Sequence, residues 1–153
     1  MRKIGYSETD QRGLDSVEPL WLKLNKHHKS RSRHFKNYFK NYTFETRKQG
    51  LLEKSHQGTM HIGLATDANT GKLVGYCIST ISGSHGEVDS IYIEKEYRYS
   101  GIGSNLMKKA IAWMDKMSVS KRIVAVAAGN EEAFGFYARY NFYPQMNILE
   151  QIQ

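Results

Sequence analysis

The 153-residue chain has one cysteine, two prolines and no long apolar run. Cys77 has no partner for an internal disulfide, which fits a reducing compartment, and its apolar surroundings favour an inert buried thiol over a nucleophile. No window approaches about 18 consecutive apolar residues and no apolar signal region opens the chain, so we expect a cytoplasmic protein with no membrane segment. Without a linker, residues 1–153 are expected to form a single domain.

Ligand sets for metals and covalent nucleophiles are also missing. The six histidines do not fall at the spacing of a Cys/His site or of His-Glu-x-x-His, and His27 and His28 point different ways as neighbours on a helix. The sequence therefore predicts no metal. It also has no Cys/His or Ser/His set that would argue for a covalent intermediate.

Positive charge is what the chain has in excess, with a formal net charge of +7. The segment from Lys23 to Lys40 is rich in lysine, arginine and histidine and contains no acid. Such a block suits three roles: a solvated helix face, a nucleic-acid contact, or attraction of an anionic acceptor or of cofactor phosphates. The solvated face is favoured and we do not expect a nucleic-acid partner, although a basic nucleic-acid-binding module stays an alternative.

Hydrophobic periodicity predicts a strand, two helices, three consecutive strands, and then helix, strand, helix and strand. Strands are expected at 3–7, 60–66, 73–82, 87–93 and 123–127, with one or two more in 142–149, and helices at 16–29, 35–55, from the 98–104 turn to 117, and 130–141. The three consecutive strands between 60 and 93 are separated by short turns, so they should form an antiparallel meander. This order predicts an α+β sheet with helices on its faces.

A glycine pair marks the junction of the 87–93 strand with the next helix. The junction reads Arg98-Tyr99-Ser100-Gly101-Ile102-Gly103-Ser104. Two glycines let the backbone approach a ligand closely, and the amides that open a helix have no intrahelical partners, so they can bind an anion. The dinucleotide fingerprint would need a third glycine where Leu106 stands, and no Gly-Lys-Ser/Thr of a P-loop is present.

The junction does fit the pattern Arg/Gln-x-x-Gly-x-Gly/Ala, and in this the chain resembles the GNAT superfamily of acyl-CoA-dependent N-acyltransferases. A second block of that family is matched downstream by Asn130, Ala133, Tyr137 and Phe142. The resemblance covers about residues 59–143. Asn141 stands where the family usually has glycine, and asparagine is the next best residue for a left-handed helix end.

The resemblance implies a mixed, mainly antiparallel sheet of six to seven strands flanked by about four helices, with a cleft between the two central strands. It also implies acetyl-CoA as co-substrate. The pyrophosphate would rest on the backbone of Arg98, Tyr99, Ser100, Gly101, Ile102, Gly103 and Ser104. The strand end Ile91, Tyr92 and Ile93 would hold the pantetheine arm and polarise the thioester carbonyl. Asn130 would bond the arm, cap its own helix, or do both.

The implied activity is direct transfer of acetyl to a primary amine of an unidentified small molecule or peptide. By the resemblance, Tyr137 would protonate the departing thiolate. For the base we expect Glu87, placed by strand alternation on the same side as Asp89 and Ile91. His85 is a weaker alternative, and a water chain is another. A non-catalytic acyl-CoA-binding module remains the second hypothesis, and a homodimer is expected because relatives often pair through sheet edges or terminal strands.

Overall fold

The computed structural model describes residues 2–56 and 58–153. Over these residues the chain forms one sheet of five strands in sequence order, antiparallel from β1 to β4, with β5 parallel to β4. The strands are β1 (Ile4–Thr9), β2 (Gly58–Asp67), β3 (Leu73–Ser82), β4 (His85–Ile93) and β5 (Lys121–Val124). The predicted α+β class and the antiparallel meander are confirmed.

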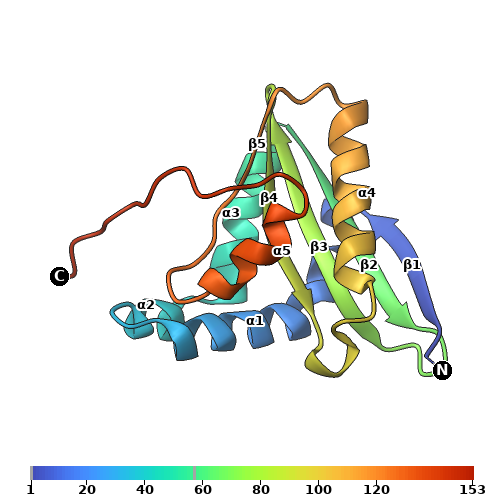
Figure 1. The fold of residues 1–153 in the computed structure, drawn as a ribbon, viewed down its shortest axis with the longest axis horizontal. Coiled ribbons are helices and arrows are strands. Elements are labelled where there is room, and N and C mark those ends of the chain that lie inside the picture. Colours follow the sequence, from blue (N-terminus) through green and yellow to red (C-terminus); the bar gives the residue numbers. More distant parts are fainter. Residues whose placement is uncertain (1, 57) are drawn as a thin grey trace.

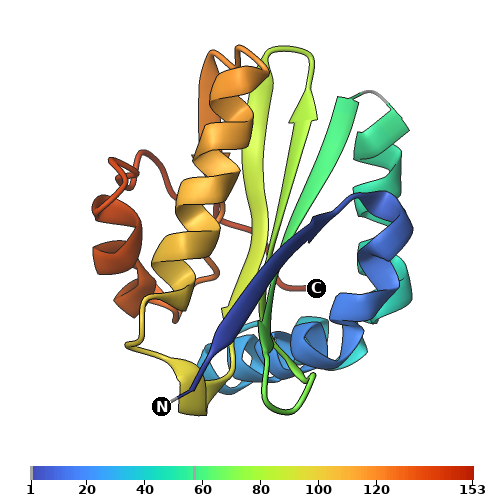
Figure 2. The ribbon, with the colours of Figure 1, turned by 90° about the vertical axis from the view of Figure 1, so that its right-hand side faces the viewer.

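Helices cover both faces of the sheet (Figures 1 and 2). One face carries α1 (Glu18–Arg31), α2 (Lys36–Asn41) and α3 (Phe44–His56), and the other carries α4 (Ile102–Lys116) and α5 (Phe134–Ala138). Short 3-10 helices span Gln11–Val17, Lys95–Tyr97 and Glu131–Ala133. Each face has its own buried cluster, one around Leu106 and Met114 of α4 and one around Trp21, Phe44 and Leu51.

The predicted count of helices needs one correction. The 35–55 segment is two helices, because the helix ends at Asn41 and a new one starts at Phe44, so five helices rather than four are found among the described residues. The break is stabilised locally. The Asn25 amide donates to the Tyr42 carbonyl, and the Thr43 hydroxyl accepts from the Thr46 amide in the manner of a helix N-cap.

The predicted count of strands is also wrong. No strand forms in 142–149 within the described chain, where Pro144 removes a backbone donor, so the sheet has five strands and not six or seven. The strand expected at 123–127 begins earlier, at Lys121, and ends at Val124. It is not fully buried: the Ile123 side chain is 44% exposed. β5 is the last strand of the sheet, so one of its edges has no strand beside it among the described residues.

A β-bulge in β4 shapes the cleft. Ile78 of β3 pairs with Ser90 while Ser79 pairs with Val88, so Asp89 is the extra residue. β5 pairs with β4 only as far as Val88 and the two strands part beyond it. Because of the bulge, the prediction that Asp89 and Ile91 lie on the same side of the strand is wrong. Ile91 packs on the α4 side of the sheet, whereas Asp89 bonds to a side chain of α3 on the other side.

Candidate active site

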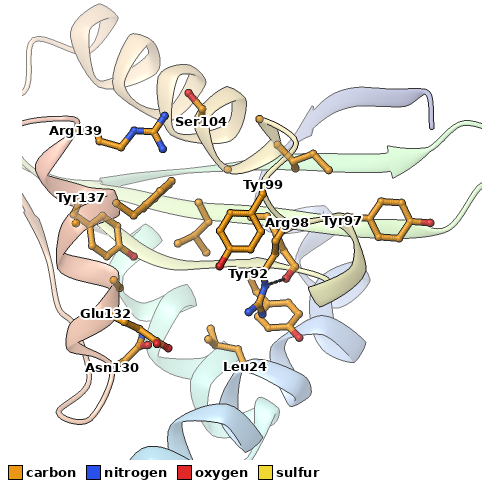
Figure 3. A pocket seen from close by; sticks show the side chains of 18 of the residues that line it. Leu24, Tyr92, Tyr97, Arg98, Tyr99, Ser104, Asn130, Glu132, Tyr137 and Arg139 are labelled. Carbon is orange, nitrogen blue, oxygen red and sulfur yellow. Dashed lines mark hydrogen bonds between the residues drawn. The ribbon is translucent and has the colours of Figure 1, made fainter. Parts of the chain in front are cut away.

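A cavity of about 780 Å³ lies between the end of β4, the loop into α4, and α5 (Figure 3). It gathers most of the residues that the sequence predicted for cofactor binding: Ile91, Tyr92, Ile93, Arg98, Tyr99, Gly101, Ile102, Gly103, Ser104, Asn130 and Tyr137. Ser100 does not line it, and its hydroxyl donates instead to the Tyr97 carbonyl at 2.6 Å. The junction before α4 therefore forms one wall of this cavity, which we call the donor wall (residues 91–104).

The start of α4 leaves amides available at this wall. Gly101 is the N-cap in a left-handed conformation, with φ of 88°, and the first intrahelical bond runs from the Asn105 amide to the Gly101 carbonyl at 3.0 Å. The three preceding amides, from Ile102 to Ser104, have no acceptor within the helix. Together with the helix dipole they make a site for an anion.

The two glycines of the junction serve different purposes. A Cβ on Gly101 would meet nothing within 4 Å, so glycine is needed there for its positive φ. Gly103 has no such φ, but a Cβ on it would come within 3.2 Å of the Phe136 ring on α5. Gly103 thus lets α5 approach α4 and close the cavity.

Arg98 is anchored rather than free. Its Nε donates to the Ile93 carbonyl at 2.9 Å, and its guanidinium lies 5.3 Å from the centre of the Tyr92 ring. These contacts tie the loop to the end of β4. The charge remains on the cavity wall, where it favours an anionic ligand (Figure 3).

Tyr137 joins the large cavity to a second, smaller one of about 50 Å³. Four residues line both cavities: Leu24, Ile91, Asn130 and Tyr137. The Tyr137 side chain is largely buried, and burial raises the pKa of its phenol above the usual value. The hydroxyl is therefore protonated at neutral pH, where it can act as a proton donor.

The smaller cavity is polar on the side of α1 and the β4 bulge. His28, Asp89 and Ser90 contribute to its lining. Nδ1 of His28 is buried and has no hydrogen-bond partner in the described part of the chain. Burial, followed by the nearby His27 and Arg47, lowers the pKa of His28 to about 4. The imidazole is neutral at pH 7.

Two carboxylates, Asp89 and Glu87, share the ammonium group of Lys54, and we call this group of side chains, together with Thr80, the acidic cluster. The Asp89 carboxyl is fully buried; Lys54 on α3 donates to it and, at 2.9 Å, to Glu87, and the Thr80 hydroxyl donates to Asp89 at 2.7 Å. Burial raises the pKa of Asp89 even beside Lys54. Glu87, which the sequence favoured as the base, faces this cluster and lines neither cavity, and neither does His85.

The comparisons with known proteins agree with this geometry. The model of the acetyltransferase (GNAT) family matches residues 21–142. The chain belongs to the GNAT family. No curated protein sequence matches the chain.

Solved structures share the GNAT fold with this chain at low sequence identity. PaiA N-acetyltransferase from Thermoplasma acidophilum, solved with coenzyme A, has a TM-score of 0.70 and 20% identity over 90% of this chain and 88% of its own. A tetramutant of the BH1408 protein from Bacillus halodurans has a TM-score of 0.73 and 14% identity, over 97% of this chain and 99% of its own. The aminoglycoside 6'-N-acetyltransferase AAC(6')-Ih from Acinetobacter baumannii has a TM-score of 0.67 and 12% identity, over 99% of this chain and 98% of its own.

Several residues of this GNAT cavity were not found by sequence reasoning. The cavity is also lined by Leu24, His27, Tyr97, Glu132, Ala133, Gly135, Phe136 and Arg139. The residues after Asn130 carry a signal, since they belong to the second family block, but nothing in the local sequence marks Leu24 or His27. Asn130 does not cap its helix with its side chain, and its Oδ1 lies 3.3 Å from His27 Nε2.

Among residues 2–56 and 58–153, no group of three or more His, Cys, Asp or Glu side chains is placed to hold a metal ion. Within the same residues, no helix has the length and apolar character to cross a bilayer.

Proposed function

We propose that this GNAT protein is an N-acetyltransferase that transfers acetyl from acetyl-CoA to a primary amine of a small molecule or peptide, by direct attack in a ternary complex. One observation carries the proposal: the free amides at the start of α4 and the protonated hydroxyl of Tyr137 line the same cavity. The first suits a pyrophosphate, and the second suits a thiolate leaving group.

The residues present fit acetyl-CoA. The amides of Ile102, Gly103 and Ser104 would hold the pyrophosphate, with the anchored charge of Arg98 beside them. Beyond Val88 one side of β4 is not paired with β5, and the backbone of 91–93 on that side would hold the pantetheine arm as an added strand does, with the Ile93 carbonyl already accepting from Arg98. When bound, acetyl-CoA supplies an activated acyl thioester.

Tyr137 is proposed as the acid. Its phenol carries a proton at neutral pH, which it would pass to the sulfur of the departing CoA, and it would regain a proton from water afterwards. Asn130, beside it on the wall of both cavities, would bond the pantetheine arm.

For the proton of the amine we propose the acidic cluster. Asp89 lines the smaller cavity next to Tyr137, and Glu87 is the more exposed carboxylate of the cluster, with 26% of its side chain accessible. Glu87 would then pass the proton to solvent. The cavity has room for a water, which several polar groups around it could hold.

The test is release of free CoA from acetyl-CoA with a panel of primary amines. Tyr137→Phe should lower kcat by about 10- to 100-fold while CoA affinity is unchanged. Tyr140→Phe is the matched control, because the buried Tyr140 hydroxyl has no hydrogen-bond partner and does not line the cavity. Its rate should stay within about twofold.

Other outcomes identify other functions. CoA binding with no turnover on any amine would indicate a non-catalytic acyl-CoA-binding module, and tight, steeply salt-dependent binding of RNA or DNA would indicate a nucleic-acid-binding one. If Glu87→Gln and Asp89→Asn both leave the pH–rate profile unchanged, the proton leaves by another route.

A further inference from the structure

The last turns of α1 hold the segment that runs from β5 to α5. His27 Nε2 donates to Asn130 Oδ1 at 3.3 Å and lies 3.6 Å from the Glu132 carboxylate. One turn further along α1, Arg31 Nε donates to the Gly129 carbonyl at 3.1 Å, and its guanidinium lies 3.6 Å from Glu132. Two side chains of α1 therefore bind this segment at three successive points.

The backbone at Gly129 shows how closely the two elements meet. Its φ is 98°, which is the left-handed region, and a Cβ built there would come within 2.3 Å of the Arg31 carbonyl oxygen. Only glycine allows this approach. The distance between α1 and the segment is thus set by the main chain, and the side chains of His27 and Asn130 meet across it.

The contact decides which end of the Asn130 amide is left for a ligand. Among the described residues, the side chain of Asn130 makes no capping bond to the helix that it precedes. The last torsion of an asparagine side chain is broad and roughly two-fold, so an amide without partners could turn either its oxygen or its nitrogen to the cavity. The bond from His27 takes the oxygen. Nδ2, a donor with no acceptor capacity, remains for the cavity that Asn130 lines (Figure 3).

We infer that His27 is a positioning residue, which orients Asn130 so that its Nδ2 donates to a carbonyl of the pantetheine arm. This rests on the proposed function, in which Asn130 bonds that arm. The arm contains amide groups, and their carbonyls need a donor when they leave water. A donor that is already oriented saves the ordering of a side chain on binding. His27 thus makes the donor site depend on α1, although its bonds are to the protein.

Calorimetric titration of CoA into a set of variants tests the inference. His27→Ala should weaken CoA binding about fivefold, the loss expected for one hydrogen bond. The double variant with Asn130→Ala should bind no more weakly than Asn130→Ala alone, because His27 acts through Asn130. In His27→Gln the side-chain amide can donate in place of the imidazole, so affinity should return to within about twofold of the parent.

A further variant tests the polarity of the bond. Asn130→Asp keeps an oxygen for His27 but has no N–H, so it should bind CoA at least as weakly as Asn130→Ala. Steady-state kinetics separate positioning from a general loss of structure. In His27→Ala the KM for acetyl-CoA should rise while kcat changes little, since the arm is bound alike in the ground and transition states. His34→Ala, an exposed histidine of the same basic segment, is the control and should bind CoA like the parent.

The outcomes separate this inference from the proposed function. Unchanged affinity in His27→Ala, additive losses in the double variant, no recovery in His27→Gln, or full affinity in Asn130→Asp each overturn it. The proposed function stands in all four cases if the parent binds CoA and releases it from acetyl-CoA with an amine. A parent protein that does not bind CoA overturns both. Alanine is favoured in a helix, so His27→Ala should stay folded, and thermal unfolding checks this.

Discussion

The donor wall and the acidic cluster stand on either side of Tyr137 and are built in opposite ways. The donor wall is a run of consecutive residues whose useful groups are backbone amides, set by a glycine with φ of 88° and by a close helix contact. The acidic cluster consists of side chains from α3, β3 and β4 that meet only in the folded protein. A site made of backbone is lost when its conformation changes, whereas a site made of buried charge is lost when one partner is removed.

The largest effect on stability is expected from Lys54→Met in the acidic cluster. This change leaves the Asp89 carboxyl, which is 0% exposed, with Thr80 as its remaining side-chain donor. Removing one partner of a buried pair costs about 3 to 5 kcal/mol, and because Lys54 is 34% exposed we expect the lower end, about 3 kcal/mol, in urea unfolding.

Two variants check this cause. Arg12→Met breaks an exposed ion pair with Asp10 and should leave the free energy of unfolding nearly unchanged. Adding Asp89→Asn to Lys54→Met should recover part of the loss, because the buried carboxylate is gone. Equal losses for the Lys54 and Arg12 variants would show that the cluster is no more than a surface ion pair.

The donor wall should respond through ligand affinity. In Gly103→Val the new side chain meets the Phe136 ring at 3.2 Å, so α5 must move away from α4 and the cavity changes shape. CoA affinity measured by calorimetry should fall about 100-fold, which corresponds to about 2.7 kcal/mol. Gly50→Val, in open space on α3, is the control and should bind CoA normally. Unchanged affinity in Gly103→Val would remove the donor wall from CoA binding.

The same contrast explains what the sequence could predict. The glycine turn that opens α4 could be predicted because it is local, and so could the left-handed Asn141, whose φ is 68°. The bounds of β3 were also predicted, since a continuous apolar run between turns fixes them. Local pattern was sufficient where backbone geometry decides the structure.

The errors arise where distant contacts decide. The bulge at Asp89 is set by pairing with β3, so strand alternation placed Ile91 on the wrong face. The break between α2 and α3 depends on Asn25, a residue of another helix. One or two more strands were expected in 142–149, but a strand forms only by pairing, and this segment pairs with no strand of the described chain.

The smallest effect is expected from His28, which lines the smaller cavity between the two regions, and it depends on pH. The folded pKa of about 4 lies below the unfolded value of about 6.5, so the unfolded state binds the proton more tightly. The stability of the protein is therefore unaffected by this group above pH 6.5 and falls as the pH is lowered toward 4, by less than the Lys54→Met loss because His28 is only partly buried. Chemical unfolding at a series of pH values should show this slope, and His28→Gln should remove it.

The control for His28→Gln is His34→Gln, because His34 is exposed and lies in the same basic segment. The His34 variant should keep the acid slope of the parent protein. Groups around His28 also titrate or carry charge: His27, Arg47 and Asp89, which lines the same cavity. The contribution of Asp89 to the pH dependence of stability has the opposite sign to that of His28, because a raised pKa of a carboxyl group favours the folded state as the pH falls. A slope that survives in His28→Gln would mean that His28 takes up its proton in the folded protein as easily as in the unfolded chain, and that the smaller cavity is open to water.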